Sequence, residues 1–395
     1  MKVRTVDQLD LSGKRVLVRV DFNVPMDKSG NVTDVTRLQA ALPTIRMAVE
    51  KGAKTILLSH LGRPKGKRVP EMSLAPVAPR LSSLLGKPVT FVPDCVGGEA
   101  EKAVAAMKPG DVLLLENVRY YAEEEKNDEG FGKRLAALCD VYVNDAFATA
   151  HRGHASNVAI LRFVKERAAG LLMKDEIAYF EKALVSPARP LVAVFGGAKI
   201  SGKIEAINNV LDKVDKILIG GAMANTFFAA LGYGIGKSLY EAEMVDTAKR
   251  VLAGAAEQKV RLYLPVDVVV AERLEASAPT RTVAVQAIPD GMMALDIGHA
   301  TCVLFREALQ DAKTIVWNGP MGAFETAPFA AGTQAVMKAL AESNALTIVG
   351  GGDTDTALHN AGLFSRMSYV STGGGAFLEL LEGKHLPGIA ALEEE

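Results

Sequence analysis

Cysteine is scarce in this chain. Its 395 residues include three cysteines, Cys95, Cys139 and Cys302, and none of them belongs to a CxxC pair. An odd number of widely spaced cysteines excludes a disulfide framework, and without a CxxC pair no cysteine-based metal site is indicated. With 49% hydrophobic residues, the composition is that of an ordinary globular protein.

Long apolar runs and an excess of charge are also missing. No stretch approaches the roughly 20 apolar residues that cross a bilayer, and the beginning of the sequence, with Lys2, Arg4 and Asp7, lacks the apolar segment of a secretory signal. The 45 basic and 46 acidic residues give a net charge of -1, which provides no overall attraction for nucleic acid or an anionic membrane. We therefore expect a cytoplasmic protein with neither of these partners.

Short apolar runs, in contrast, recur along the whole chain and alternate with helical stretches. In the first half the runs are Arg15–Val20, Thr55–Leu58, Val112–Leu115 and Val141–Val143. In the second half they are Leu191–Phe195, Lys216–Ile219, Val266–Val270, Thr314–Trp317, Leu346–Val349 and Ser368–Val370. The predicted helices between them are Thr36–Glu50, Phe131–Cys139, Ile204–Val210, Glu241–Glu257 and Thr333–Ala341. Continuous apolar runs are typical of strands buried on both faces of a parallel sheet, so the fold class is α/β.

The length predicts two domains. Ala169–Leu184 is predicted to form one amphipathic helix, and Pro187 and Pro190 follow it. We place the junction there, with a first domain at 1–170, an interdomain helix at 171–186 and a second domain at 187–376. Each domain is expected to be Rossmann-like, with a parallel sheet flanked by helices, and a cleft is expected between them.

The residues that follow the strands differ between the two halves. Ligands of open parallel sheets bind beyond the carboxyl ends of the strands. In the first half these positions carry cationic side chains, namely Arg19, Arg37, His60, Arg63, Arg119 and Arg152. Because guanidinium groups bind carboxylate and phosphate oxygens in pairs, several of them together predict a small ligand with several negative charges.

In the second half the strand ends are rich in glycine. The glycine-rich corners are Gly196–Lys199, Gly220–Met223, Asn318–Gly322, Gly350–Thr354 and Thr372–Gly375. Glycine lets backbone N–H groups approach phosphate closely, so this half is predicted to bind a nucleotide. Lys199 and Lys203, four residues apart on one predicted helix, could contact the same phosphates. Asp353 could hold Mg²⁺, and Glu325 could accept hydrogen bonds from ribose hydroxyls.

Three further patterns are assigned ordinary roles. Gly232–Ser238 resembles a P-loop, but position 231 is Leu where the motif needs glycine. His151 and His154 lack further metal ligands nearby. The acidic run Glu123–Glu125 is interpreted as solvated surface.

Nine motifs together resemble the phosphoglycerate kinase family from end to end. They are RVDFNVP (Arg19–Pro25), SHLGRP (Ser59–Pro64), ENVRYY (Glu116–Tyr121), VNDAFATAHRGHAS (Val143–Ser156), GGAKISGKI (Gly196–Ile204), IGGAMANTF (Ile219–Phe227), WNGPMGAFE (Trp317–Glu325), GGGDT (Gly350–Thr354) and STGGGAFLELLEGK (Ser371–Lys384). The resemblance implies reversible transfer of a phosphoryl group from 1,3-bisphosphoglycerate to MgADP, which gives 3-phosphoglycerate and MgATP. It also implies a monomer whose lobes close around the substrates, with the segment at about 377–395 packed back on the glycerate-binding first domain.

The same resemblance implies roles for individual residues. The implied substrate site is Asp21, Phe22, Asn23, Arg37, His60, Leu61, Gly62, Arg63, Arg119 and Arg152. The implied nucleotide site is Lys203, Gly298, Glu325, Gly351, Gly352, Asp353 and Thr354, with Asp353 on the metal through the nucleotide phosphates. The groups implied to stabilise the phosphoryl in transit are Arg37, Lys199, Gly373 and Gly374. Gly202, Val35, Ala148, Gly153 and His299 depart from the family pattern, and none of them removes a charged group from these sets.

Two other functions are compatible with parts of the pattern. An NAD-dependent dehydrogenase would also use glycine-rich corners, but a well-placed G-x-G-x-x-G with an acid about 20 residues on is missing. A non-catalytic two-lobed anion-binding protein would explain the arginines but not Lys199, Lys203 and Asp353.

Overall fold

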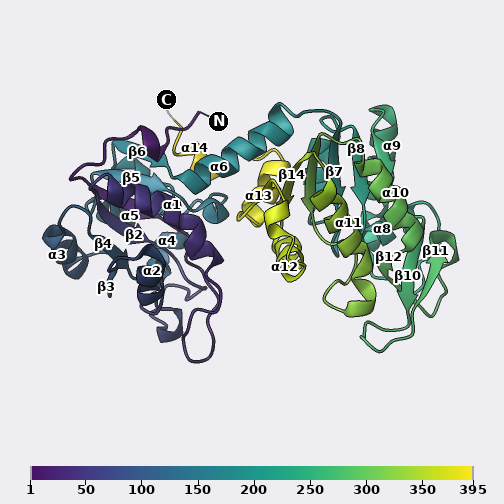
Figure 1. Cartoon of the computed structure of the whole chain (residues 1–395), viewed down its shortest axis with the longest axis horizontal. Coiled ribbons are helices and arrows are strands. Elements are labelled where there is room, and N and C mark those ends of the chain that lie inside the picture. Colours follow the sequence, from purple (N-terminus) through teal and green to yellow (C-terminus); the bar gives the residue numbers. More distant parts are fainter. Residues whose placement is uncertain (1, 394–395) are drawn as a thin grey trace. The chain divides into compact units, whose positions relative to one another are not determined.

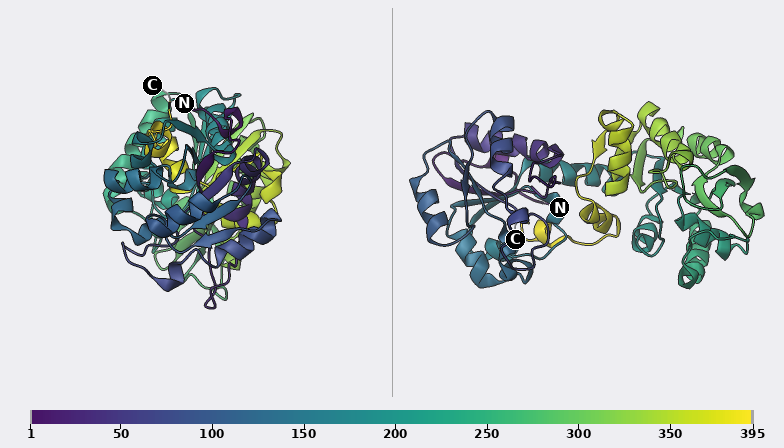
Figure 2. Two further views of the ribbon diagram at one scale, coloured as in Figure 1. Left: turned by 90° about the vertical axis from the view of Figure 1, so that its left-hand side faces the viewer. Right: turned by 90° about the horizontal axis from the view of Figure 1, so that it is seen from below.

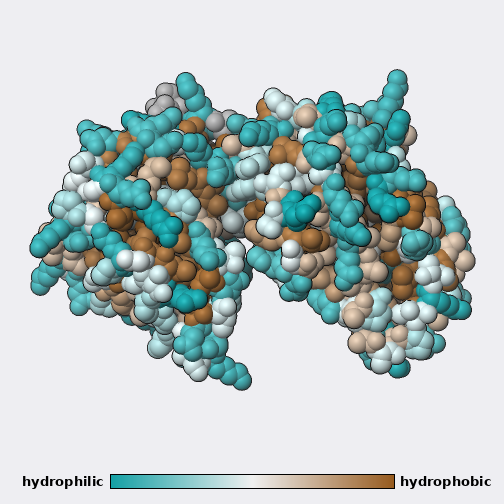
Figure 3. Space-filling model, in the orientation of Figure 1, coloured by the Kyte–Doolittle hydropathy of each residue, from teal (hydrophilic) through white to brown (hydrophobic). Residues whose placement is uncertain are grey.

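The protein, described here as a computed structural model of residues 2–393, forms two compact units. The first unit comprises the chain as far as Ala178 and resumes at His385, and the second comprises Tyr179–Lys384. Hydrophilic side chains are spread over the surface of both units in the view of Figure 3. No helix within the described residues is both long and apolar enough to span a membrane.

The first unit is built on a parallel sheet with the strand order β3-β4-β2-β1-β5-β6 (Figure 1). Its strands are β1 (Arg15–Arg19), β2 (Lys54–Leu58), β3 (Thr90–Val92), β4 (Val112–Leu115), β5 (Val141–Asn144) and β6 (Glu166–Ala169). β4 and β5 are buried throughout, as continuous apolar strands between two helical layers must be. The parallel α/β architecture predicted for this half is confirmed.

Helices flank this sheet. The α-helices of the first unit are α1 (Thr36–Glu50), α2 (Val77–Leu85), α3 (Gly98–Ala106), α4 (Ala122–Glu125), α5 (Glu129–Ala136) and α14 (Pro387–Ala390). Its 3-10 helices are η1 (Val6–Gln8), η2 (Pro70–Met72), η3 (Val118–Tyr120), η4 (Phe147–Thr149) and η5 (Ala159–Arg162). α1 packs on β2 and α2 and contributes Leu38, Leu42 and Ile45 to the core beneath the sheet.

The second unit contains another parallel sheet, in the order β15-β14-β13-β7-β8-β9. Its strands are β7 (Leu191–Phe195), β8 (Lys216–Ile219), β9 (Arg261–Tyr263), β13 (Thr314–Asn318), β14 (Leu346–Gly350) and β15 (Tyr369–Val370). Trp317 of β13 is fully buried in the core beneath α10 and α11.

A small antiparallel sheet, β11-β10-β12, accompanies it. Its strands are β10 (Asp267–Ala271), β11 (Arg281–Ala284) and β12 (Met293–Ile297). The predicted strand Val266–Val270 therefore lies in this sheet, and its assignment to the parallel sheet was wrong. A run of valines predicts a buried strand, but it does not say which partner the strand will pair with.

The helices of the second unit cover its parallel sheet. Its α-helices are α7 (Ile204–Val210), α8 (Met223–Ala230), α9 (Val245–Glu257), α10 (His299–Leu309), α11 (Ala331–Glu342), α12 (Gly352–Asn360) and α13 (Gly375–Leu381). Its short helices are the π-helix η6 (Glu181–Val185) and the 3-10 helices η7 (Ala242–Met244), η8 (Val285–Ala287), η9 (Ala327–Phe329) and η10 (Phe364–Arg366).

The chain passes between the units twice. The first crossing is α6 (Leu171–Phe180), which continues into η6. At its start, Leu171 N donates to Thr44 Oγ1 (2.8 Å) and Met173 N donates to Asp145 Oδ1 (3.2 Å). The second crossing lies at Lys384 and His385, because α13 packs on α7 in the second unit. The part that returns to the first unit thus begins at 385 rather than at about 377.

The returning segment meets the beginning of the chain. Val3 and Glu393 form an isolated antiparallel bridge, and the two ends lie side by side in Figure 2. Leu386, Ile389 and Leu392 are buried. Gly388 N donates to Ala150 O (2.8 Å), which ties the segment to the loop that carries Arg152.

Candidate functional site

The carboxyl ends of four strands bring the cationic residues of the first unit together. β1 leads to Arg19, β2 to His60, β4 to Arg119 and β5 to Arg152. Because these strands are parallel and adjacent in the order β4-β2-β1-β5, their ends share one edge of the sheet. The convergence predicted from the sequence is therefore present at this edge.

The pKa of His60 shows how close the arginines lie to its imidazole ring. Its side chain is buried, and burial lowers its pKa well below the ordinary value, with further lowering from Arg19, Arg119, Arg152 and Arg37 in that order. Four like charges close to one imidazole strongly disfavour imidazolium. His60 is therefore neutral near neutral pH.

Hydrogen bonds fix the loops that hold these side chains. Asn117 Nδ2 donates to Leu61 O (2.7 Å) and Met72 O (2.9 Å), and Asn117 Oδ1 accepts from Leu61 N (3.2 Å). Asn23 Oδ1 accepts from Gly62 N (2.8 Å). The backbone of the 60–63 loop is thereby joined to the ends of β1 and β4.

The two apolar residues assigned to the substrate site contribute through the backbone. Phe22 is fully buried and its N–H donates to Ser59 Oγ (2.8 Å). Leu61 is also buried. Their side chains belong to the core, so any contact with a ligand must come from their main-chain atoms.

The arginines differ in how the protein pairs them. Arg37 Nη1 donates to Asp21 Oδ2 in a short contact. Arg119 Nη1 donates to Gly62 O (2.8 Å), while its Nε and Nη2, both buried, have no hydrogen-bond partner within the described chain. Arg63 and Arg152 form no ion pair among residues 2–393. The edge thus carries cationic N–H groups in excess of the carboxylates that could neutralise them.

Arg119 illustrates the consequence of this crowding. Burial first, and then the nearby charges of Arg152 and Arg19, lower its pKa to about 10 against the opposing effect of Glu125 and Glu124. It remains charged at neutral pH. A buried charge with unused donors is unfavourable by itself and becomes favourable when an anion binds.

Glycine corners line a hollow at the carboxyl edge of the second parallel sheet. The hollow measures about 300 Å³ and is lined by Gly197, Ala198, Lys199, Lys203, Asn318, Gly319, Pro320, Gly351, Gly352, Asp353, Thr354, Gly374, Gly375 and Leu378. Gly351, the N-cap residue of α12, has φ 105°, a left-handed conformation that favours glycine. The N–H groups at the start of α12 therefore border the hollow.

Lys199 and Lys203 do not share a helix face, which corrects the prediction. Residues 201–203 form a turn, and α7 begins only at Ile204, with Lys203 as its N-cap residue. The Nζ of Lys203 donates to Gly196 O (2.6 Å) and Asn318 O (2.9 Å). The glycine-rich segment before α7 lacks the residues of high helix propensity that would let the helix begin earlier. Both lysines nevertheless line the same hollow.

The donor set of this hollow fits a magnesium ion only in part. Asp353 is exposed at the start of α12, and Thr354 is buried, with its Oγ1 accepting from Gly319 N (2.8 Å). No group of three or more His, Cys, Asp or Glu residues suited to a metal occurs in the described chain. One carboxylate together with phosphate oxygens is a common Mg²⁺ arrangement, so the residues fit an ion that arrives with a nucleotide.

Three residues implied for the second unit do not line this hollow. Gly298 is the N-cap residue of α10, beside the carboxylate of Asp267. Glu325 is exposed in the loop between β13 and η9. Gly373 donates its N–H to Ser371 Oγ (3.1 Å) and precedes Gly374, the N-cap residue of α13.

Three of the five residues that depart from the family pattern lie at helix starts or in a turn. Val35 is the N-cap residue of α1, His299 is the first residue of α10, and Gly202 is exposed in a turn. The first residue of a helix needs no intrahelical N–H bond, which explains why histidine is accepted there. A Cβ at Gly202 would meet no atom within 4 Å.

The acidic run was misinterpreted at one position. Glu123 and Glu125 are partly exposed, but Glu124 is fully buried. Its two carboxylate oxygens accept from Ser156 N (2.8 Å) and Ser156 Oγ (2.6 Å). Three consecutive glutamates in a four-residue helix point in different directions, and only tertiary packing determines which of them faces inward.

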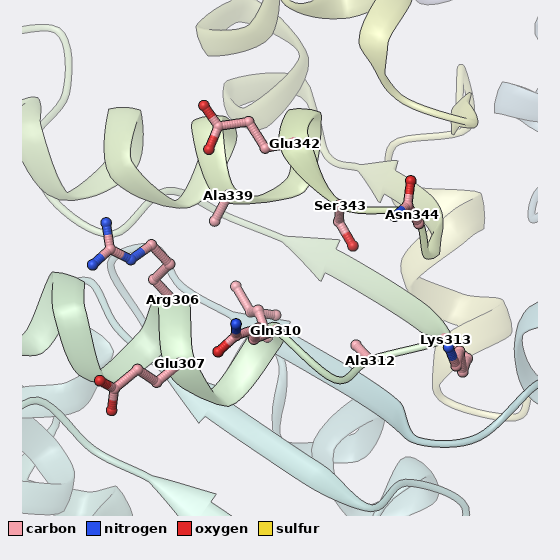
Figure 4. Close-up of a pocket in the computed structure, with 10 residues that line it drawn as sticks. Arg306, Glu307, Gln310, Ala312, Lys313, Ala339, Glu342, Ser343 and Asn344 are labelled. Atoms are coloured by element: carbon pink, nitrogen blue, oxygen red, sulfur yellow. The ribbon is translucent and has the colours of Figure 1, made fainter.

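Two other hollows lie at the opposite edge of the second parallel sheet. One measures about 500 Å³ and is lined by residues of α10 and α11, with Lys313 and Asn344 just before β13 and β14 (Figure 4). The other measures about 940 Å³ and includes Asp215 and Lys216 at the start of β8. The amino ends of parallel strands are not where this architecture binds ligands.

Comparisons with known proteins agree with one another. The family model described as phosphoglycerate kinase matches residues 6–384. Phosphoglycerate kinases of Geobacter metallireducens and Geobacter sp. are 59% and 58% identical to the chain, each over 100% of it and 99% of the relative. The solved structure of phosphoglycerate kinase from Coxiella burnetii matches with a TM-score of 0.91 and 46% identity over 99% of this chain and 98% of that one. The corresponding structure from Pyrococcus horikoshii matches with a TM-score of 0.84 and 34% identity, over 98% of both chains. The chain therefore belongs to the phosphoglycerate kinase family.

Proposed function

We propose that the chain performs the family's reaction with one ligand on each unit. The phosphoryl group passes reversibly from 1,3-bisphosphoglycerate, held by the first unit, to MgADP, held by the second, and gives 3-phosphoglycerate and MgATP. The observation that carries this assignment is the excess of strand-end arginine N–H groups around a neutral His60. Such an edge suits a ligand with both carboxylate and phosphate groups.

The first unit supplies the glycerate site. The unused N–H groups of Arg119 and the unpaired Arg63 and Arg152 bind the negative oxygens of the substrate. Arg37 is paired with Asp21, and we propose that it turns to the transferring phosphoryl when substrate is bound. Asn23 and the backbone of Leu61 and Gly62 complete the site.

The second unit supplies the nucleotide site. The Lys203 ammonium uses two of its three donors on Gly196 O and Asn318 O, which leaves one for a phosphate oxygen. The N–H groups at the start of α12 and the Gly351–Thr354 corner hold the other phosphate oxygens, while Gly298 and Glu325 contact the nucleoside. Asp353 would hold Mg²⁺, which when bound would offset the negative charge of the phosphates.

The chemistry needs no general base. The leaving group of an acyl phosphate is a carboxylate, which is already anionic at neutral pH. What must be stabilised is the charge on the three equatorial oxygens of the transferring group. We assign this task to Arg37, Lys199 and the N–H groups at Gly373 and Gly374, and we assign His60 to orienting the substrate.

An assay that couples 3-phosphoglycerate-dependent ATP consumption to NADH oxidation tests the proposal. The wild-type protein should consume ATP only when 3-phosphoglycerate is present, a dependence that neither a dehydrogenase nor a simple binding protein shows. Arg63→Ala should raise the KM for 3-phosphoglycerate, whereas Arg80→Ala, an exposed arginine of α2, should not. Equal behaviour of the two variants would contradict the assigned site.

A monomeric state and a cytoplasmic location stay predictions of the sequence. Size-exclusion chromatography with light scattering tests the first of these.

A further inference from the structure

Four buried or nearly buried side chains connect the core of the first unit to His60. They are Glu124, Ser156, Arg19 and His60 itself, and each is at most 3% exposed. They come from α4, the loop after η4, the end of β1 and the loop after β2. None of the first three belongs to the substrate site that the family resemblance implies, although the sequence places Arg19 in the cationic cluster.

The donors and acceptors that these four side chains carry determine the direction of each hydrogen bond between them. Ser156 Oγ donates its single hydrogen to Glu124 Oε1 (2.6 Å), so its lone pair accepts from Arg19 Nε (2.9 Å). Arg19 Nη2 faces His60 Nδ1 at 3.3 Å. A guanidinium has donors and no acceptor, so His60 Nδ1 must be the acceptor.

This order leaves one protonation pattern for the His60 ring. If Nδ1 accepts, the ring hydrogen of the neutral imidazole lies on Nε2. The alternative hydrogen on Nδ1 would have to be accepted by Asp21 Oδ1, which is 3.9 Å away and already accepts from Asn23 N (3.0 Å). That separation is too long for a hydrogen bond.

We propose that Arg19 is a positioning residue that fixes His60 as its Nε2–H tautomer from within the core, and that Glu124 holds Arg19 in place through Ser156. His60 then offers an N–H donor at Nε2 without adding a further positive charge to the cluster. The proposal rests on the proposed substrate site, to which His60 belongs.

The charges of Arg19 and Glu124 support this arrangement. Arg19 forms no ion pair within the described residues, and its remaining contact is a short bond from Nη1 to Val20 O. A buried guanidinium needs a counter-charge nearby. Glu124 provides one across the Ser156 hydroxyl, and Arg19 in turn lowers the pKa of Glu124 against the dominant raising effect of burial.

The first experiment reads the tautomer directly. Long-range ¹H–¹⁵N correlation spectra of the ligand-free protein at neutral pH distinguish the two imidazole nitrogens, and His60→Gln identifies the signals. We expect a neutral ring with hydrogen on Nε2. An Nδ1–H tautomer, or an imidazolium, would overturn the proposal even if every variant folds poorly.

The second experiment removes the Ser156 hydroxyl, which links Glu124 to Arg19. Ser156→Ala should weaken binding of 3-phosphoglycerate in calorimetry about tenfold, the order expected for one hydrogen bond to a charged group, and should leave ADP binding unchanged. In its spectra the His60 signals should shift toward a mixture of tautomers. Unchanged affinity together with an unchanged tautomer would refute the role of Ser156.

Two further variants make the result specific. Thr55→Val removes another fully buried hydroxyl of the first unit, one with no hydrogen-bond partner in the described chain, and should change neither readout. Arg63→Ala separates this proposal from the proposed function. If Arg63→Ala weakens binding of 3-phosphoglycerate and Ser156→Ala does not, the hydrogen-bonded path to His60 is wrong and the substrate site stands. If neither variant weakens binding, the substrate site itself is wrong.

Discussion

The arginines at the edge of the first sheet look alike in the sequence, but the structure uses them differently. Arg19 is fully buried and donates hydrogen bonds to protein atoms, whereas two nitrogen atoms of Arg119 have no hydrogen-bond partner among the described residues. Residue type and position after a strand predicted the cluster. They could not predict which arginine is internal, because that depends on Ser156 and Glu124, which are distant in the sequence.

Arg37→Ala tests the residue proposed to stabilise the transferring phosphoryl. We expect turnover to fall about a thousandfold, the order found when one strong transition-state donor is lost. Steady-state kinetics with saturating substrates measures the effect. Arg46→Ala, an exposed arginine on the same helix that donates to Leu84 O (3.0 Å), is the matched control. A turnover within about threefold of wild type would show that Arg37 does not have this role.

If Lys203 binds the nucleotide phosphates as we propose, ADP binding should depend on pH. Burial lowers the pKa of its ammonium to about 8, with Asp353 acting in the opposite direction. As pH rises from about 7 to about 9 the ammonium loses its proton, so the attraction for phosphates that are already ionised should decline. Calorimetry of ADP binding across this range should show falling affinity.

The matched variants separate this effect from general alkaline changes. Lys203→Met should bind ADP weakly with little pH dependence, while Lys249→Ala, an exposed lysine of α9, should follow wild type. If the ADP affinity of the wild-type protein stays constant up to about pH 9, ADP binding does not depend on the proton of Lys203.

At the scale of elements, apolar runs predicted the central strands well and the edge strands badly. β3, β6, β9, β11 and β12 were missed, and each lies at the edge of its sheet, whereas the edge strand β15 was predicted. β6, with the sequence ERAA, has half its residues partly exposed. An edge strand has a neighbour on one side only, so it needs fewer apolar side chains. The same limit applies to Lys203, since where a helix begins depends on tertiary contacts as much as on local sequence.

Asp267 is expected to stabilise α10 from a neighbouring strand. The N-cap residue of α10, Gly298, has no side chain to cap the helix. Asp267 of β10 accepts hydrogen bonds from Ala300 N (3.0 Å) and Thr301 N (2.8 Å) instead. Asp267→Ala should lower the free energy of unfolding by about 1 kcal/mol, as for loss of a capping side chain. Denaturant unfolding followed by circular dichroism measures this, and Asp246→Ala, exposed in the first turn of α9, should have a smaller effect.

At the scale of the whole molecule, each unit has its own parallel sheet, at whose carboxyl edge we propose one ligand site, and the chain joins the units at two points. The returning segment contributes three buried apolar residues and a hydrogen bond to Ala150, close to Arg152. The first unit therefore depends on residues at both ends of the chain. Closure of the lobes on substrate stays a prediction, which small-angle scattering with and without both ligands tests.

Removal of residues 385–395 should affect the two substrates unequally. Loss of Leu386, Ile389 and Leu392 exposes the apolar surface that they cover, and loss of the bond from Gly388 frees the Arg152 loop. We expect lower thermal stability and weaker binding of 3-phosphoglycerate, with ADP binding retained. His385→Ala, exposed at the start of the segment, is the control, and an equal loss of both affinities would contradict the expectation.

The double crossing also has a consequence for synthesis on the ribosome. Most of the first unit precedes the second unit in the sequence, but its segment from His385 on is made only after the whole second unit. The sheet of the first unit can therefore assemble before the second unit is made, whereas the Arg152 loop gains the support of Gly388 only afterwards. A nascent chain should therefore acquire its proposed nucleotide site in final form before its proposed glycerate site, although most of the latter is encoded first.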